Sequence, residues 1–169
     1  MKAITEICTD YNLKLIEDAC QAHGAEYMDI KTGSFGDAAC FSFYPTKNMT
    51  TGEGGMITTS NAAIAEKAMV IREHGSRVRY LHEVLGYNYR MTDIQAALGI
   101  SQMNKLEDFI ERRSAIADLY DRALFDNPYF EIPVKHEKRQ SSHHLYPIRL
   151  KTPFRPYKEK IVKGFSDEG

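Results

Sequence analysis

The alternation of hydrophobic and polar positions divides the first part of the chain into short elements. Residues 2–10 carry apolar side chains on one helical face and predict a short helix that stops at Tyr11–Asn12. An apolar run over residues 13–16 follows and ends at Glu17–Asp18. This run predicts a buried strand, although periodicity alone does not separate such a strand from a helix.

Two further strands and a capped helix are predicted downstream. Apolar stretches at residues 38–44 and 56–60, separated by a glycine-rich loop, predict strands. One residue of the Ser60–Asn61 pair can cap a helix over residues 62–74, and Gly75 stands at the C′ position that commonly ends helices. Helices and strands that follow one another in this way indicate a layered α/β architecture.

A long helix is predicted from residue 93 onward. Thr92 and Gln95 form a capping-box pattern at its start, and an apolar stripe continues to about Leu124. Such a helix would be roughly 45 Å long at 1.5 Å per residue, which exceeds one small core. We therefore expect it to connect two domains or to support a dimer contact.

The last part of the chain predicts a polar loop, a strand and a helix. The loop covers residues 135–143, the strand covers residues 144–150, and helical spacing begins near residue 153, with Gly169 in the place of a C-cap. Because the chain begins and ends at element boundaries, we expect it to be part of a larger fold.

Composition narrows the class of protein. The 169 residues are 43% hydrophobic and 27% charged, with a net charge of −1, which suits a soluble domain or a large piece of one. This charge gives no reason to expect binding to nucleic acid or to an anionic membrane. No apolar run reaches the ~20 residues that span a bilayer, and the N-terminus does not resemble a secretory signal. Three widely spaced cysteines predict neither a disulfide framework nor a zinc site, so we expect a reducing cytoplasm.

The first candidate for chemistry is the carboxylate at the end of the first predicted strand. Open α/β sheets bind their ligands at the carboxyl ends of strands, which is where Asp18 stands. The competing interpretation makes Asp18 the cap of a short helix, with Gln21 as its capping-box partner. Both interpretations can hold at once.

The second candidate is Lys47, which follows the strand predicted at residues 38–44. A lysine among apolar and small residues can be desolvated, which makes its amine nucleophilic. The alternative is an ordinary surface lysine. The glycine loop that follows lacks the spacing of a phosphate-binding fingerprint and indicates a turn. The six histidines have no metal-ligand spacing, so we expect no metal site.

Three long segments together resemble one family. LIEDACQAHGAEY, GSFGDAACFSFYPTKNMTTGEGGMITTS and HEVLGYNYRMTDIQAALGISQMNKLEDFIERR occur in this order and are similar to the DegT/DnrJ/EryC1/StrS sugar aminotransferases. The resemblance implies the α/β fold of the pyridoxal-phosphate (PLP) transferases of aspartate-aminotransferase fold type I. It also implies PLP as cofactor.

Matching positions imply the catalytic pair. Lys47 matches the lysine that forms the Schiff base with the cofactor, and Asp18 matches the carboxylate that pairs with its pyridine nitrogen. A related sugar dehydratase has histidine in place of this lysine, so Lys47 favours transamination. The implied reaction transfers an amino group, usually from glutamate, to a nucleotide-linked keto-sugar that serves amino-sugar and cell-surface polysaccharide biosynthesis.

Four more positions match cofactor contacts. Gln21 matches the residue that reaches the phenolic oxygen, and Ser42 matches a phosphate-binding hydroxyl. Cys20 takes the place of a small alanine against the ring face. Asn88 matches the asparagine that contacts the phosphate of the neighbouring subunit, which implies a homodimer.

The resemblance implies three parts of the chain. Residues 1–92 would be a partial PLP-binding large domain, residues 93–124 a long connecting helix, and residues 125–169 the start of a truncated small domain. Family members are longer and carry an N-terminal Gly-Thr phosphate loop that is absent here. The alternative expectation is therefore a non-catalytic fragment that associates with a full-length homologue.

Overall fold

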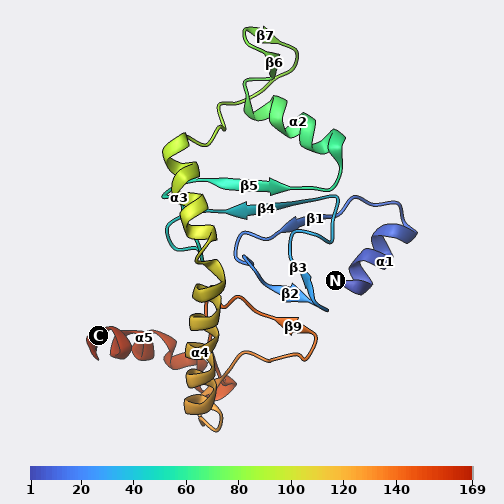
Figure 1. The fold of residues 1–169 in the computed structure, drawn as a ribbon. Coiled ribbons are helices and arrows are strands. Elements are labelled where there is room, and N and C mark those ends of the chain that lie inside the picture. Colours follow the sequence, from blue (N-terminus) through green and yellow to red (C-terminus); the bar gives the residue numbers. More distant parts are fainter. Residues whose placement is uncertain (169) are drawn as a thin grey trace.

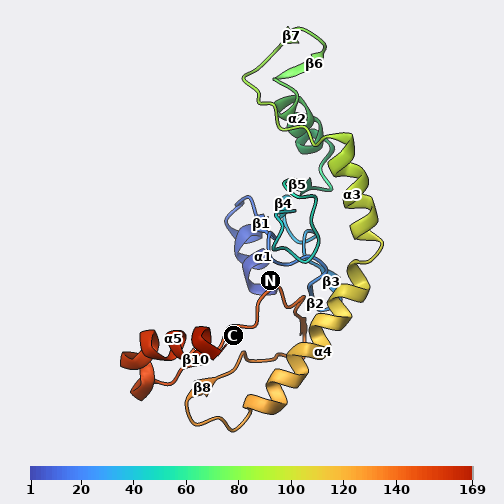
Figure 2. The same cartoon turned by 90° about the vertical axis from the view of Figure 1, so that its left-hand side faces the viewer.

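The computed structural model describes residues 1–168, and a three-stranded sheet stands at the centre of its first half (Figures 1 and 2). The strands are β1 (Ile16–Asp18), β4 (Ala38–Ser42) and β5 (Gly55–Thr58). Their order is β1–β4–β5, in which β1 is parallel and β5 antiparallel to β4. This mixed sheet agrees with the predicted α/β class.

Helices and short strand pairs surround this sheet. The helices are α1 (Lys2–Asp10), α2 (Ala62–Arg72), α3 (Asp93–Met103), α4 (Leu106–Leu124), the 3₁₀ helix η1 (Thr152–Tyr157) and α5 (Lys158–Glu168). The short strands are β2 (Glu26–Tyr27), β3 (Ile30–Lys31), β6 (Ser76–Val78), β7 (Leu81–His82), β8 (Phe130–Glu131), β9 (Arg139–Gln140) and β10 (Arg149–Leu150). None of the helices in this described part is long and apolar enough to cross a membrane.

The strand predictions are confirmed in place, but one is wrong about burial. β4 and β5 occupy the predicted stretches, and β1 covers the end of the first apolar run. The exposed fractions of Leu13 and Ile16 are 54% and 68%, so this run is not buried, and β1 lies at the edge of the sheet. The strand expected over residues 144–150 shrinks to β10, in part because Pro147 has no N–H to donate to a ladder.

The predicted long helix is two helices. The Thr92–Gln95 capping box is present at the start of α3, as expected. The helix stops after Met103, where the N–H of Lys105 bonds to the carbonyl of Gln102 at 3.0 Å in a tighter turn. Lys105 has φ of −111°, outside the helical range, so α4 begins as a separate helix.

The end of α2 differs from its prediction by one residue. Asn61 caps the start, as one of the two expected candidates. At the end, His74 rather than Gly75 occupies C′, with φ of +60°. Gly75 is C″, and its N–H bonds to the carbonyl of Val70 at 2.9 Å, as in a Schellman motif. A Cβ at Gly75 would lie 1.7 Å from the carbonyl oxygen of Val84, so only glycine fits here.

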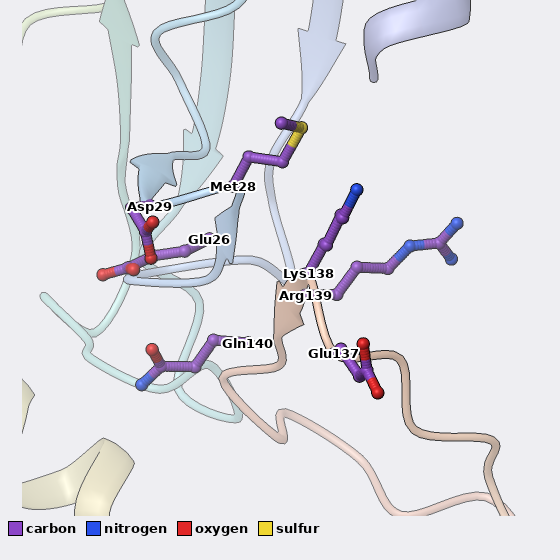
Figure 3. Close-up of a pocket in the computed structure, with 7 residues that line it drawn as sticks. All are labelled: Glu26, Met28, Asp29, Glu137, Lys138, Arg139 and Gln140. Atoms are coloured by element: carbon purple, nitrogen blue, oxygen red, sulfur yellow. The ribbon is translucent and has the colours of Figure 1, made fainter.

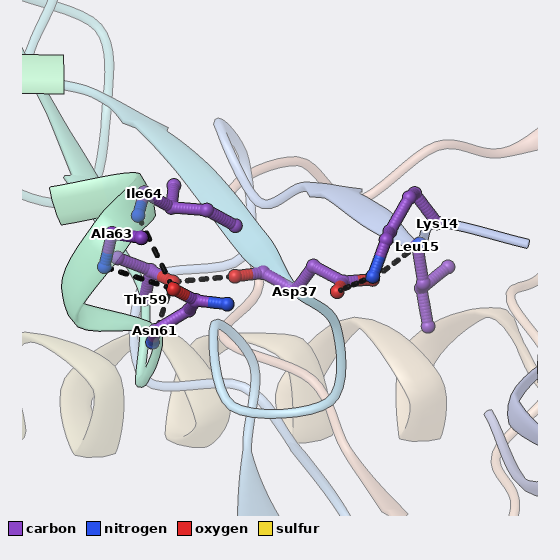
Figure 4. A network of polar contacts seen from close by, with 7 residues as sticks. All are labelled: Lys14, Leu15, Asp37, Thr59, Asn61, Ala63 and Ile64. Carbon is purple, nitrogen blue, oxygen red and sulfur yellow. Dashed lines mark hydrogen bonds and ion pairs between the residues drawn. The ribbon is translucent and has the colours of Figure 1, made fainter. Parts of the chain in front are cut away.

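Asp37 joins the sheet to the start of α2 (Figure 4). Its carboxylate accepts hydrogen bonds from the Lys14 amine and the Leu15 N–H, both at 3.0 Å, and these donors lower the pKa of Asp37. Its carbonyl accepts from the Thr59 hydroxyl, which in turn accepts from the Asn61 N–H at 3.1 Å. The network links the chain before β1, the start of β4 and the cap of α2.

Glu17 holds the turn that precedes β4. Its carboxylate accepts three backbone hydrogen bonds, from Gly33 at 2.8 Å, Phe35 at 2.7 Å and Gly36 at 2.9 Å. Hydrogen bonds to a charged acceptor contribute more than neutral ones. Glu17 therefore fixes the chain that returns to the sheet beside β1.

His23 is packed into the core behind this sheet. Its side chain is 3% exposed, and its ring centroid lies 5.4 Å from that of Phe41 and 5.9 Å from that of Phe43. Neither ring nitrogen has a hydrogen-bond partner among the described residues. Burial penalises the imidazolium and lowers the pKa of His23 below its ordinary value.

An ion-pair cluster ties the C-terminal segment to α4. The Lys135 amine lies 2.6 Å from carboxylate oxygens of both Asp118 and Asp121, which raises the pKa of Lys135 to about 12. The Tyr146 hydroxyl donates to Asp121 at 2.6 Å. Residues before and after β9 are therefore fixed to the same face of one helix.

We predict that Glu17→Gln lowers the free energy of unfolding by about 1–3 kcal/mol, because an amide cannot accept all three backbone hydrogen bonds. Urea titration followed by circular dichroism measures this. Glu111→Gln, an exposed position on α4, is the matched control and should change stability by less than about 0.5 kcal/mol. Equal effects of the two substitutions would contradict the assigned role of Glu17.

We predict that His23→Phe weakens the acid sensitivity of the fold. The folded pKa of His23 is lowered, so its contribution is complete above about pH 6.5 and is lost as the pH falls below that value. Melting temperatures between pH 7 and pH 5 should fall less steeply in the variant than in the wild type. Some slope remains, because burial also lowers the pKa of His143 and of His144. The exposed His136→Phe is the control, and equal slopes in His23→Phe and wild type would refute the prediction.

Candidate functional site

Asp18 ends β1 and begins the candidate site. Its side chain is exposed, and Oδ1 accepts the N–H of Cys20 at 3.1 Å. The chain then makes a turn in which the Ala22 N–H bonds to the Ala19 carbonyl at 2.9 Å. No helix starts here, so the interpretation of Asp18 as a helix cap with Gln21 as its partner is wrong.

The surroundings of Asp18 keep it ionised. Hydrogen bonding by Cys20, whose N–H donates to Oδ1, lowers the pKa of Asp18, and the charge of Lys47 lowers it further. In return, burial and the neighbouring Asp18 raise the pKa of the Cys20 thiol. The result is a carboxylate beside a neutral thiol.

Ser42 and Lys47 approach from the neighbouring strand. Ser42 ends β4, and its hydroxyl oxygen accepts the N–H of Tyr44 at 3.3 Å. Because β1 and β4 are parallel, Asp18 and Ser42 lie at the same edge of the sheet. The chain turns after Tyr44, whose carbonyl accepts the Lys47 N–H at 2.9 Å.

Lys47 is less exposed than the residues that directly precede it. Its side chain is half-buried, whereas the three residues before it are exposed. Burial lowers the pKa of His23 and of His144, and the charge of Lys47 lowers both further. The same charge adds to the effect of the Cys20 hydrogen bonding on the pKa of Asp18. The amine therefore belongs to a cluster of ionisable groups at the carboxyl edge of β1 and β4.

The predicted site residues divide into two groups. Asp18, Cys20, Ser42 and Lys47 gather at this edge, and Gln21 is exposed in the adjoining turn. Asn88 lies elsewhere. It forms a β-bridge with Glu73 just after α2, in the part of the molecule that extends beyond β5 (Figure 1).

Three residues of this region were not predicted from the sequence. His23 and Asn48 are 3% and 4% exposed, and His144 is half-buried with a buried Nδ1. Each has at least one polar atom without a partner in the described chain. Asn48 follows Lys47 directly, which is the signal that could have pointed to it, whereas nothing in the sequence relates His144 to this edge.

The cavity in Figure 3 is a separate feature. It has a volume of about 310 Å³ and lies between the β2–β3 turn and β9, lined mainly by charged side chains such as Glu26, Asp29 and Lys138. None of the predicted site residues lines it. Within residues 1–168, no group of three or more His, Cys, Asp or Glu side chains is arranged to hold a metal ion.

Solved structures of similar chains share this fold. Helicobacter pylori PseC, an aminotransferase involved in the biosynthesis of pseudaminic acid, is 35% identical with a TM-score of 0.93, over 99% of this chain and 46% of that one. The PLP-form of Spr1654 from Streptococcus pneumoniae is 28% identical with a TM-score of 0.78, over 94% of this chain and 44% of that one. These neighbours confirm the predicted fold class.

Sequence relatives lead to the same assignment. A Campylobacter jejuni UDP-4-amino-4,6-dideoxy-N-acetyl-beta-L-altrosamine transaminase is 39% identical over 173 residues, which cover 100% of this chain and 46% of the relative. The chain thus spans about half the length of the curated relatives it matches. The model of the DegT/DnrJ/EryC1/StrS aminotransferase family, whose aminotransferases depend on PLP, matches residues 1–169. The chain belongs to the DegT/DnrJ/EryC1/StrS aminotransferase family.

Proposed function

We propose that the protein of which this chain is part transfers an amino group from glutamate to a nucleotide-linked keto-sugar, with PLP as cofactor. The product would be an amino sugar for cell-surface polysaccharides. The observation that carries this proposal is the half-buried Lys47 amine beside the ionised Asp18, at one edge of the sheet, in a chain of this family. The names of the relatives support the substrate class.

The side chains at this edge fit the cofactor chemically. No ion pair or side-chain hydrogen bond engages Lys47 in the described chain, so its amine is free to bind an aldehyde. Asp18 has one oxygen on Cys20 and its other oxygen free for a pyridinium N–H. The Ser42 hydroxyl accepts from Tyr44 and keeps its own hydrogen for a phosphate.

Each residue then has a defined task. When bound, the cofactor supplies an electron sink for the transamination. Asp18 would hold a proton on the ring nitrogen through a charge-assisted hydrogen bond, and the Lys47 amine would hold the cofactor and accept the proton taken from the donor Cα. Gln21 would contact the phenolic oxygen, and Cys20 would lie against the ring.

We predict that borohydride reduction in the presence of PLP labels Lys47 selectively, as mapped by mass spectrometry. Asp18→Asn should weaken labelling of Lys47 by about 10- to 100-fold, because the variant loses a hydrogen bond to a charged group worth about 1.5–3 kcal/mol. Labelling of the exposed Lys67 on α2 serves as the internal reference.

Two outcomes separate the alternatives. Selective labelling of Lys47 that depends on Asp18 would support a formed cofactor site and justify assays with keto-sugar nucleotides and glutamate. Labelling spread over Lys47 and exposed lysines alike would contradict the enzyme proposal for this chain and favour the non-catalytic fragment.

We also propose that the protein is a homodimer in which Asn88 serves the site of the neighbouring subunit. The separation of Asn88 from the other five site residues supports this arrangement. α3 adds an exposed apolar surface, with exposed fractions of 84% for Ile94 and 67% for Ile100. Such surfaces are typical of protein–protein contacts.

We predict that Ile94→Glu together with Ile100→Glu weakens dimerisation at least 10-fold, because the charges would be desolvated in the contact. Sedimentation velocity over a concentration series measures the dissociation constant. Val162→Glu on α5, where Val162 is 57% exposed, is the matched control. A monomeric wild type, or equal dissociation constants for the variants, would refute the proposed contact.

A further inference from the structure

The loop that carries Lys47 is fixed by hydrogen bonds at Phe43, where it begins, and at Thr50 and Thr51, where it ends. The carbonyl of Phe43 accepts the Thr51 N–H at 3.1 Å and the Thr50 hydroxyl at 2.8 Å. The Thr50 N–H donates to the side chain of Gln102 on α3 at 3.3 Å. These contacts close the loop and leave two residues, Asn48 and Met49, between Thr50 and Lys47.

Next to Lys47, the loop has one side-chain hydrogen bond to a distant segment, made by Asn48. Asn48 donates from Nδ2 to the carbonyl oxygen of Ser142 at 2.7 Å, across 94 residues of sequence. Asn48 and Ser142 are 4% and 2% exposed. A hydrogen bond shielded from water in this way is stronger than an exposed one, and its loss leaves an unpaired carbonyl.

The segment that receives this bond is itself anchored to α4. Arg113 donates from Nη1 to the carbonyl of His143 at 3.1 Å and to that of His144 at 3.4 Å. Tyr146, two residues further along, is fixed by Asp121. Ser142 therefore offers a rigid acceptor, and the position of Asn48 follows that of α4.

We propose that Asn48 is a positioning residue that holds the Lys47 amine at the carboxyl edge of β1 and β4 through its hydrogen bond to Ser142. This inference rests on the proposed role of Lys47. Lys47 lies between two fixed points, its own N–H on the Tyr44 carbonyl and the neighbouring Asn48. Without the Asn48 bond, only the N–H bond of Lys47 to Tyr44 and the packing of the buried Met49 would hold this part of the loop, so the Lys47 amine would be positioned less tightly beside Asp18.

Asn48→Asp makes the proposal testable by pH. A protonated carboxylic acid donates to the Ser142 carbonyl, whereas a carboxylate cannot, and burial raises the pKa of such a carboxyl group. Lys47 labelling by PLP and borohydride, divided by that of Lys67, is measured from pH 5 to pH 8 and expressed relative to wild type. His23 and His144 titrate nearby in both proteins, and dividing by the wild-type value removes the contribution that the two proteins share.

The expected result is a ratio near 1 at pH 5 that falls at least 10-fold by pH 8 in Asn48→Asp. In Asn48→Ala the labelling ratio should be low at every pH, because alanine has no group that can donate to the Ser142 carbonyl. Arg113→Met should lower the ratio about 3-fold or more by loosening Ser142, while the neighbouring exposed Arg112→Met should leave it unchanged. Circular dichroism at each pH reports the fold of every variant.

The outcomes distinguish the two proposals. Absence of selective Lys47 labelling in the wild type would refute the proposed function itself. Selective labelling in the wild type with a pH-independent ratio in Asn48→Asp, or with equal effects of the two arginine variants, would overturn the positioning role alone. If Asn48→Asp unfolds at high pH, the comparison of the arginine variants decides.

Discussion

The parallel pairing of β1 with β4 is the interaction on which the candidate site depends. Asp18 pairs with Cys40 in this ladder. The hydrogen bonding continues past the end of β1, where the Ala19 N–H donates to the Cys40 carbonyl at 2.9 Å. The pairing brings Asp18, at the end of β1, close to Ser42, at the end of β4. These two residues are 24 positions apart in the sequence (42 − 18 = 24). Glu17 and Asp37 stabilise it from both sides.

Local sequence patterns predicted where most helices and strands lie, but not what packs against them. The capping box at Thr92 and the helix around Ile4 follow from spacing within a few residues, and both are present. Burial of β1 depends on neighbours distant in sequence, and the tighter turn after Met103 interrupts an apolar stripe that continues through it, so both predictions fail. Periodicity states which face is apolar but not what covers that face.

The candidate site shows the same division. Lys47 and Asp18 could be predicted from the sequence, because each follows or ends a predicted strand and lies in a motif of the family. His23, Asn48 and His144 act through contacts between segments far apart, and no local spacing marks such contacts. The resemblance to sugar aminotransferases implied which residues contact the cofactor, whereas the structure adds three buried or half-buried polar side chains around them.

The bond between Asn48 and Ser142 has a kinetic consequence. It closes a loop of 94 residues, and the entropy lost on closure grows with the logarithm of loop length. Strand pairing among β1, β4 and β5 involves much shorter separations and can form first. The loop that carries Lys47 should therefore reach its final geometry late in folding, after α4 and the segment that contains Ser142 have folded against it.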